Sequence, residues 1–198
     1  MTFIGAKGGV GATTVALNIA AALAALDHPT IATEWCWPRG NFSLYLAEPP
    51  PTNLSAIGTL PPRAITASVL KKLLVTSTVS RVAVRNSSTV VVVLERNPES
   101  VVLANETLSM IRSWAAGDIA ITAVVVTKGG SATPMSLDDI RSGLRCGVVG
   151  VVPPSTEPMP GFSKRLPITI SRQGTLPADA LTDIAKRLAS KQLELLAS

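Results

Sequence analysis

The sequence predicts a three-layer α/β/α fold with a mostly parallel, twisted sheet. Residues 89–94 and 119–127 are almost uniformly apolar and rich in β-branched residues, which is typical of strands buried on both faces. Segments with helical apolar spacing alternate with these strands, and this alternation favours a parallel sheet covered by helices on both sides. A glycine-rich loop also joins the first expected strand to the first expected helix.

The composition predicts one compact domain that spans residues 1–198. The chain is 46% hydrophobic and 16% charged, against about a quarter charged in an average globular protein. This balance excludes intrinsic disorder, and no low-complexity linker divides the chain. The net charge of +5 is compatible with anionic partners but too small to predict a dedicated nucleic-acid binder.

The first half of the chain begins with a short apolar strand at residues 2–4 and a helix at residues 13–26 that is rich in alanine and leucine. Two proline clusters further on predict a surface excursion, because proline fixes φ and has no N–H for a central strand. The other elements expected here are an extended segment at residues 30–34, a turn at 38–41, a helix at 65–75 and a strand at 81–85.

The second half repeats strand and helix more clearly. Beside the two buried strands we expect helices at residues 99–114 and 137–144, a strand at 148–152 and a last helix at 177–196. The last helix carries apolar residues at helical spacing: Leu181, Ile184, Ala185, Leu188 and Leu195. It is predicted to close the sheet, and binding to an anionic membrane surface is the alternative.

Several kinds of site are excluded or disfavoured by residue counts. His28 is the one histidine and precedes Pro29, so a turn role is expected and histidine-based triads are excluded. Cys36 and Cys146 lie far apart without a CxxC motif, which disfavours a zinc site or a disulfide and fits a reducing cytoplasm. No apolar run reaches the roughly 18 residues that span a bilayer.

The loop at residues 5–14 carries the expected chemistry. Its glycines permit backbone conformations that close amides around phosphate oxygens, and the following helix adds the positive end of its dipole. Thr13 is the expected magnesium ligand through its hydroxyl. The expected nucleotide-binding residues of this loop are Gly8, Gly9, Val10, Gly11, Ala12, Thr13 and Thr14.

The loop resembles the deviant Walker A motif of the MinD and ParA superfamily, normally KGGVGKTT and here KGGVGATT at residues 7–14. The resemblance implies a P-loop NTPase-like fold, ATP or ADP with Mg²⁺ as cofactors, and a homodimer. It also implies that Lys7 contacts nucleotide across the dimer interface. Ala12 replaces the lysine that reaches the β- and γ-phosphates in that family, which predicts impaired hydrolysis.

Other positions also depart from the family pattern, and these departures likewise predict impaired hydrolysis. Trp35 and Trp37 replace the expected switch acids. Glu34 is then, with Lys7, the candidate catalytic residue, and a solvated carboxylate at the end of the strand is the alternative. No aspartate follows a hydrophobic strand as a Walker B residue would. Thr127 stands where relatives have an adenine-facing asparagine, and Pro153 lies in the proline loop that abuts the adenine. One expectation is therefore that the chain has lost the ability to bind nucleotide and Mg²⁺.

Within the superfamily, the chain is most similar to the CpaE and TadZ group, which implies a protein partner in a positioning or assembly machine. Three hypotheses remain: a degenerate, dimerising assembly factor; a slow ATPase in partition or division-site placement; and a scaffold that binds no nucleotide. A cytoplasmic location is expected, at the inner face of the membrane if the last helix binds lipid. The basic bias of residues 141–198 also allows weak nonspecific DNA contact.

Overall fold

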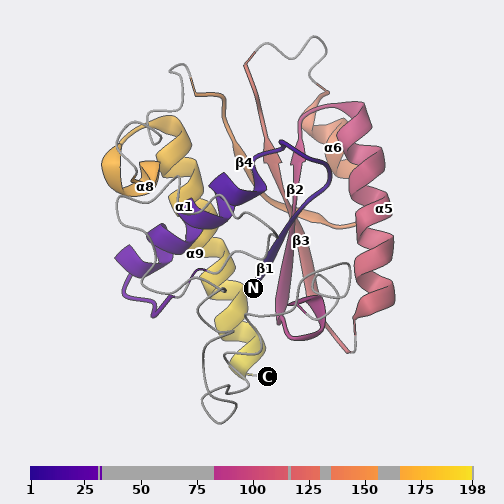
Figure 1. Ribbon diagram of the computed structural model, residues 1–198, viewed down its shortest axis with the longest axis horizontal. Helices are drawn as coiled ribbons and strands as arrows, with labels where there is room; N and C mark the ends of the chain where they lie inside the picture. The colour runs from indigo at the N-terminus through magenta and orange to yellow at the C-terminus, as the bar shows by residue number, and fades with distance from the viewer. Residues whose placement is uncertain (31, 33–82, 116, 130–134, 156–165, 198) are drawn as a thin grey trace, which may run out of the picture.

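The computed structural model describes residues 1–30, 32, 83–115, 117–129, 135–155 and 166–197. Strands and helices alternate along these residues (Figure 1). The elements are β1 (Thr2–Gly5), α1 (Ala12–Ala25), β2 (Thr89–Glu95), α5 (Pro98–Trp114), β3 (Ala120–Val126), α6 (Leu137–Gly143), β4 (Gly147–Val152), α8 (Ile168–Ser171) and α9 (Leu176–Ala197).

The described strands form one parallel sheet in the order β1-β2-β3-β4. Gly5 of β1 is in register with Val93 of β2, and Glu95 of β2 is in register with Val126 of β3. All carboxyl ends therefore lie at one edge of the sheet, where ligands bind in open α/β folds. The predicted parallel sheet is confirmed.

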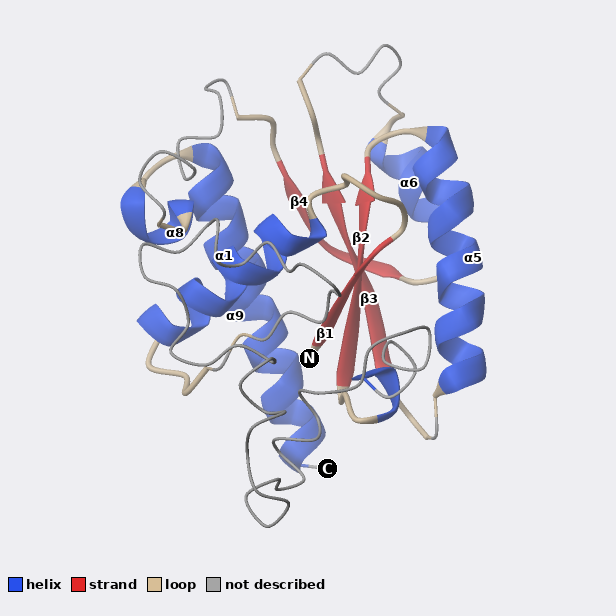
Figure 2. Cartoon of the chain, viewed as in Figure 1, coloured by secondary structure: helices blue, strands red, loops and turns tan. Residues whose placement is uncertain are grey.

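Helices cover both faces of the sheet, as Figure 2 shows. Val91 and Val93 of β2 point into the core cluster shared with α1 and α9, whereas Val90, Val92 and Leu94 point into the cluster shared with α5 and α6. All five side chains are 0% exposed, which explains the uninterrupted apolar run in the sequence. The expected three-layer α/β/α architecture is confirmed.

The last helix packs as the closing helix of the sheet. Leu181, Ile184, Ala185 and Leu188 are buried in the core cluster that α9 shares with α1 and β4. Leu195 lies in the part of α9 whose side chains are not described. None of the helices in the described part of the chain combines the length and apolarity that a membrane span needs.

The expected strand at residues 81–85 is wrong where the structure describes it, because residues 83–85 form a helical turn. The amides of Asn86 and Ser87 donate to the carbonyls of Ala83 and Val84, and the Val84 side chain is buried against the α5 side of the sheet. The turn at residues 38–41, the helix at 65–75 and most of the segment at 30–34 lie outside the described residues.

Candidate functional site

The loop between β1 and α1 is anchored at both its start and its middle. The amide of Ala6 donates to the carbonyl of Val93 (2.8 Å), which holds the start of the loop against β2. The side chain of Val10 is 1% exposed and belongs to the core cluster under α1. Because these two points are fixed, the residues between them must turn over the carboxyl edge of the sheet.

Glycines make this turn possible. Gly9 (φ 75°) and Gly11 (φ 91°) adopt the left-handed conformation that side chains disfavour. Gly11 is the N-cap of α1 and supplies no side-chain cap to the helix. No hydrogen bond between described residues uses the amides of Ala12, Thr13 or Thr14. An added Cβ at Gly9 or Gly11 would meet nothing within 4 Å, so the loop surface there is open.

Free amides at the positive end of a helix, behind an open loop, form a site that suits an anion such as a phosphate group. The neighbouring Ala12 side chain packs against the apolar core and contributes no charge to this site. The loop can therefore bind phosphate through its backbone, independently of the missing lysine.

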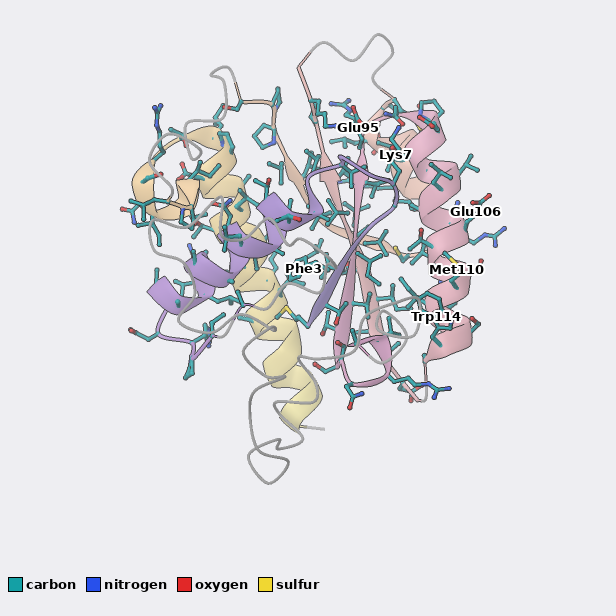
Figure 3. The ribbon with its side chains drawn as sticks, viewed as in Figure 1. Phe3, Lys7, Glu95, Glu106, Met110 and Trp114 are labelled. Carbon is teal, nitrogen blue, oxygen red and sulfur yellow. The ribbon has the colours of Figure 1, made fainter. Side chains whose placement is uncertain are left out.

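Lys7 forms an ion pair within its own chain. Its Nζ donates to Oε2 of Glu99 over 2.5 Å, and the two side chains are 27% and 69% exposed. Glu99 lies in the first turn of α5, which Asn97 caps by accepting from the amide of Ser100. Figure 3 shows Lys7 at the same end of the sheet as Glu95.

Lys128 also contacts the loop, although sequence reasoning did not select it. Its Nζ donates to the carbonyl of Gly9 (2.7 Å) and lies 3.4 Å from Oε2 of Glu95. Lys128 comes two residues after β3 ends, and Glu95 is the last residue of β2. A charged residue just past a buried parallel strand was the signal available, because such positions face the ligand edge of the sheet.

The other predicted site residues are placed as follows. Thr127 donates its amide to the carbonyl of Val152 (2.9 Å), so Thr127 and the adjacent Pro153 lie at the same carboxyl edge as the loop. Thr13 lies in the first turn of α1 and is half-buried. Glu34, Trp35 and Trp37 lie outside the described residues.

Metal ligands are sparse in the described part of the chain. It contains no group of three or more His, Cys, Asp or Glu side chains that could hold a metal ion.

The environment of Cys146 does not activate its thiol. Cys146 is a free, half-buried thiol. Burial raises its pKa, and this effect exceeds the opposing influence of Arg112. A raised pKa keeps the sulfur protonated and weakly nucleophilic.

A parallel α/β sheet with a glycine-rich loop between its first strand and first helix is typical of P-loop folds and of dinucleotide-binding folds. Comparison with solved structures identifies this as the MinD and ParA type of P-loop NTPase fold. No protein-family model matches the sequence, and no curated protein matches it.

Three of these structures illustrate the similarity. MinD of Pyrococcus horikoshii OT3, complexed with Mg-ADP, superimposes with a TM-score of 0.80 at 14% identity over 96% of both chains. The MinC:MinD cell division complex of Aquifex aeolicus gives 0.74 at 18% identity over 96% of both chains. A ParA family ATPase of Chlorobium tepidum TLS gives 0.68 at 13% identity over 93% of this chain and 98% of that one. At these identities the likeness shows the fold.

Proposed function

We propose that this chain is a degenerate MinD/ParA-like protein that binds ATP or ADP weakly, hydrolyses ATP slowly or not at all, and acts as a dimerising positioning or assembly factor. The observation that carries the proposal is the set of amides at the start of α1 that pair with no other described residue, behind the open glycine turn. A nucleotide supplies the phosphate that such a site accommodates.

The proposed binding set is the one expected from the sequence, with backbone atoms as the main donors. The amides of residues 8–14 would hold phosphate oxygens, and Thr13 would hold Mg²⁺ through its hydroxyl. Thr127 and Pro153 would flank the base, a role supported by their position at the carboxyl edge. MinD of Pyrococcus horikoshii, which shares the fold, carries Mg-ADP in its structure.

Impaired hydrolysis is supported by what surrounds the loop. Phosphoryl transfer depends on positive groups that stabilise charge as it develops, and their loss slows the step by orders of magnitude. Ala12 supplies no such group, and Lys7 is engaged by Glu99 within its own chain. Glu34 is proposed as the carboxylate that orients water if hydrolysis occurs.

The proposed biological role is that of a single-domain homodimer in which Lys7 contacts nucleotide across the interface. The similarity to the CpaE and TadZ group supports a partner within a positioning or assembly machine. Among solved structures of the same fold, MinD of Aquifex aeolicus is seen in complex with MinC. We further propose a cytoplasmic location, with weak contact to DNA or to an anionic membrane surface.

Calorimetric titration with Mg-ATP tests binding. We expect saturable binding by the wild type and weaker binding by Lys7→Ala. If the wild type binds neither ATP nor ADP at millimolar concentration, the scaffold hypothesis replaces this proposal.

A turnover assay tests hydrolysis. We expect the wild type to release phosphate at close to the background rate, and Ala12→Lys to raise that rate. Turnover by the wild type at the rate of active relatives would instead support the second candidate, a working ATPase. That candidate is favoured by Glu95, a carboxylate with 15% exposure at the carboxyl end of the strand beside β1.

A further inference from the structure

We propose that Lys128 supplies to the bound phosphates the positive charge that Ala12 cannot supply. This inference rests on the proposed function, because it names the side chain through which the same loop would bind nucleotide. Its basis is the position of the Lys128 ammonium on the loop itself, 2.7 Å from the carbonyl oxygen of Gly9.

The sheet brings Lys128 to the loop from a distant part of the sequence. β2 lies between β1 and β3, and neighbouring strands are about 4.8 Å apart, so the loop strand and the strand that ends before Lys128 are separated by about 10 Å. The amide of Thr127 still pairs with Val152 of β4, which makes Lys128 the next residue free to cross the carboxyl edge. Its flexible four-carbon stem carries the ammonium over the end of β2 to Gly9.

The donors of Lys128 are not exhausted by its contacts. An ammonium has three N–H donors. One is used by Gly9 and a second by Glu95 at the longer distance of 3.4 Å, which leaves a third for a phosphate oxygen. The Lys128 side chain is 44% exposed, so its ammonium is accessible to a ligand that arrives from solvent.

The charges around the loop favour an exchange of contacts, in which the Lys128 ammonium leaves the Glu95 carboxylate and binds a phosphate oxygen. The described ion pairs beside the loop are Lys7 with Glu99 and Lys128 with Glu95, and each is partly exposed. A partly exposed ion pair contributes little stability. A phosphate group carries more negative charge than one carboxylate, so the contact with Lys128 is stronger once phosphate occupies the loop.

The competing explanation is that Lys128 has a structural role only, which we call the structural strap. In that case Lys128 only fixes the loop backbone through the Gly9 carbonyl, and its charge is irrelevant to the ligand. The two explanations differ in one testable respect: a lysine placed at position 12 can restore a missing charge but cannot restore a missing bond to Gly9.

The test is a calorimetric titration of the full chain with Mg-ADP, Mg-ATP and AMP. The variants are Lys128→Met, Ala12→Lys, and Ala12→Lys together with Lys128→Met. Lys186→Met is the matched control, because it removes one exposed lysine that pairs with Asp183 within α9. Thermal unfolding of each variant checks the fold, which we expect to tolerate the exposed Lys128 substitution.

We expect Lys128→Met to weaken Mg-ADP and Mg-ATP binding by about tenfold to a hundredfold, the range for a hydrogen bond to a charged group. AMP binding and the Lys186→Met control should change little. Adding Ala12→Lys to Lys128→Met should restore Mg-ADP affinity to within about threefold of the wild type.

Three results would overturn the inference. Unchanged affinity of Lys128→Met excludes any role toward the phosphates. Weakened binding that Ala12→Lys does not restore assigns Lys128 to the structural strap. A wild type that binds no nucleotide removes the proposed function as well, whereas the first two results leave that function intact.

Discussion

The residues that matter most to the site are four charged side chains around the glycine-rich turn. In the proposed function the loop binds phosphate through its backbone, so Lys7, Glu99, Lys128 and Glu95 would adjust the potential that a phosphate meets. Two of these four groups are acids that oppose an anionic ligand. Their removal is therefore predicted to strengthen binding, which a role in shaping the loop would not predict.

Replacing Glu99 by glutamine removes one of these acids and frees the Lys7 ammonium. We expect Mg-ADP to bind about twofold to fivefold more tightly, since an exposed ion pair is worth about 1 kcal/mol or less. Calorimetric titration measures the change. Glu106→Gln is the control, because Glu106 is exposed on the same helix two turns further on, as Figure 3 shows. Equal effects of the two substitutions would refute a local influence of Glu99.

At this scale the sequence predicts the residues of the loop but not those that reach it from elsewhere. Glycines and threonines in a contiguous motif identify residues 8–14 directly. Lys128 is 119 positions away from Gly9, and its contact depends on the order of β1, β2 and β3 in the sheet. The position of Lys128 just past a buried strand indicates the ligand edge of the sheet, but no local pattern encodes the strand order, so its contact with Gly9 could not be predicted.

At the scale of elements, α9 packs tightly against β4 at Gly150. An added Cβ there would lie 2.3 Å from Cγ1 of Ile184, nearer than atoms can pack. We expect Gly150→Ala to lower the free energy of unfolding by about 1–3 kcal/mol, the usual cost of overpacking. Urea denaturation measures it.

Two further variants make the overpacking test specific. Gly147→Ala on the same strand should be nearly neutral, because a Cβ there meets nothing within 4 Å. Ile184→Ala removes the atoms that clash, so its combination with Gly150→Ala should cost less than the sum of the two single changes. Additive costs would contradict close packing at this point.

The contact between α1 and α8 includes one buried side-chain amide, that of Asn18. Asn18 is 3% exposed, donates from Nδ2 to the carbonyl of Thr14 (2.8 Å) and accepts at Oδ1 from the amide of Thr169 (3.2 Å). Asn18→Leu leaves the Thr169 amide without this partner, and we expect a loss of about 1–3 kcal/mol in the free energy of unfolding.

Asn105 provides a matched control for Asn18. It also donates once and accepts once, to the carbonyl of Gly143 and from the amide of Arg145, but it is only half-buried. Urea denaturation of Asn105→Leu should show a smaller loss, because water can replace its partners. A larger loss than for Asn18→Leu would contradict the role assigned to burial.

The sequence predicts an element well where both of its faces are buried, and less well where only one side chain is buried. The strands β2 and β3 are almost uniformly apolar because both of their faces are covered. The segment at residues 81–85 reads RVAVR, a short apolar run between two arginines that resembles a strand, yet a single helical turn at residues 83–85 is enough to bury Val84. A pattern of five residues does not distinguish a short strand from a helical turn.

For the whole molecule, the architecture follows from the alternation of strands and helices, whereas the proposed dimer is expected to depend on the ligand. If Lys7 contacts nucleotide bound to a partner subunit, nucleotide must fill the interface before a dimer is stable. Sedimentation velocity should show the 20.6 kDa chain becoming a dimer when Mg-ATP is added, but not with AMP. Lys7→Ala should remain monomeric, and a dimer of Lys7→Ala as stable as that of the wild type would contradict this role.

The most direct test is a nuclear magnetic resonance titration of the ¹⁵N-labelled chain with ADP, in which every backbone amide is followed separately. We expect the largest shifts at residues 8–14, because their N–H groups are the proposed phosphate donors. Shifts confined to other residues, or none at millimolar ADP, would contradict the claim that this loop binds nucleotide through its main chain.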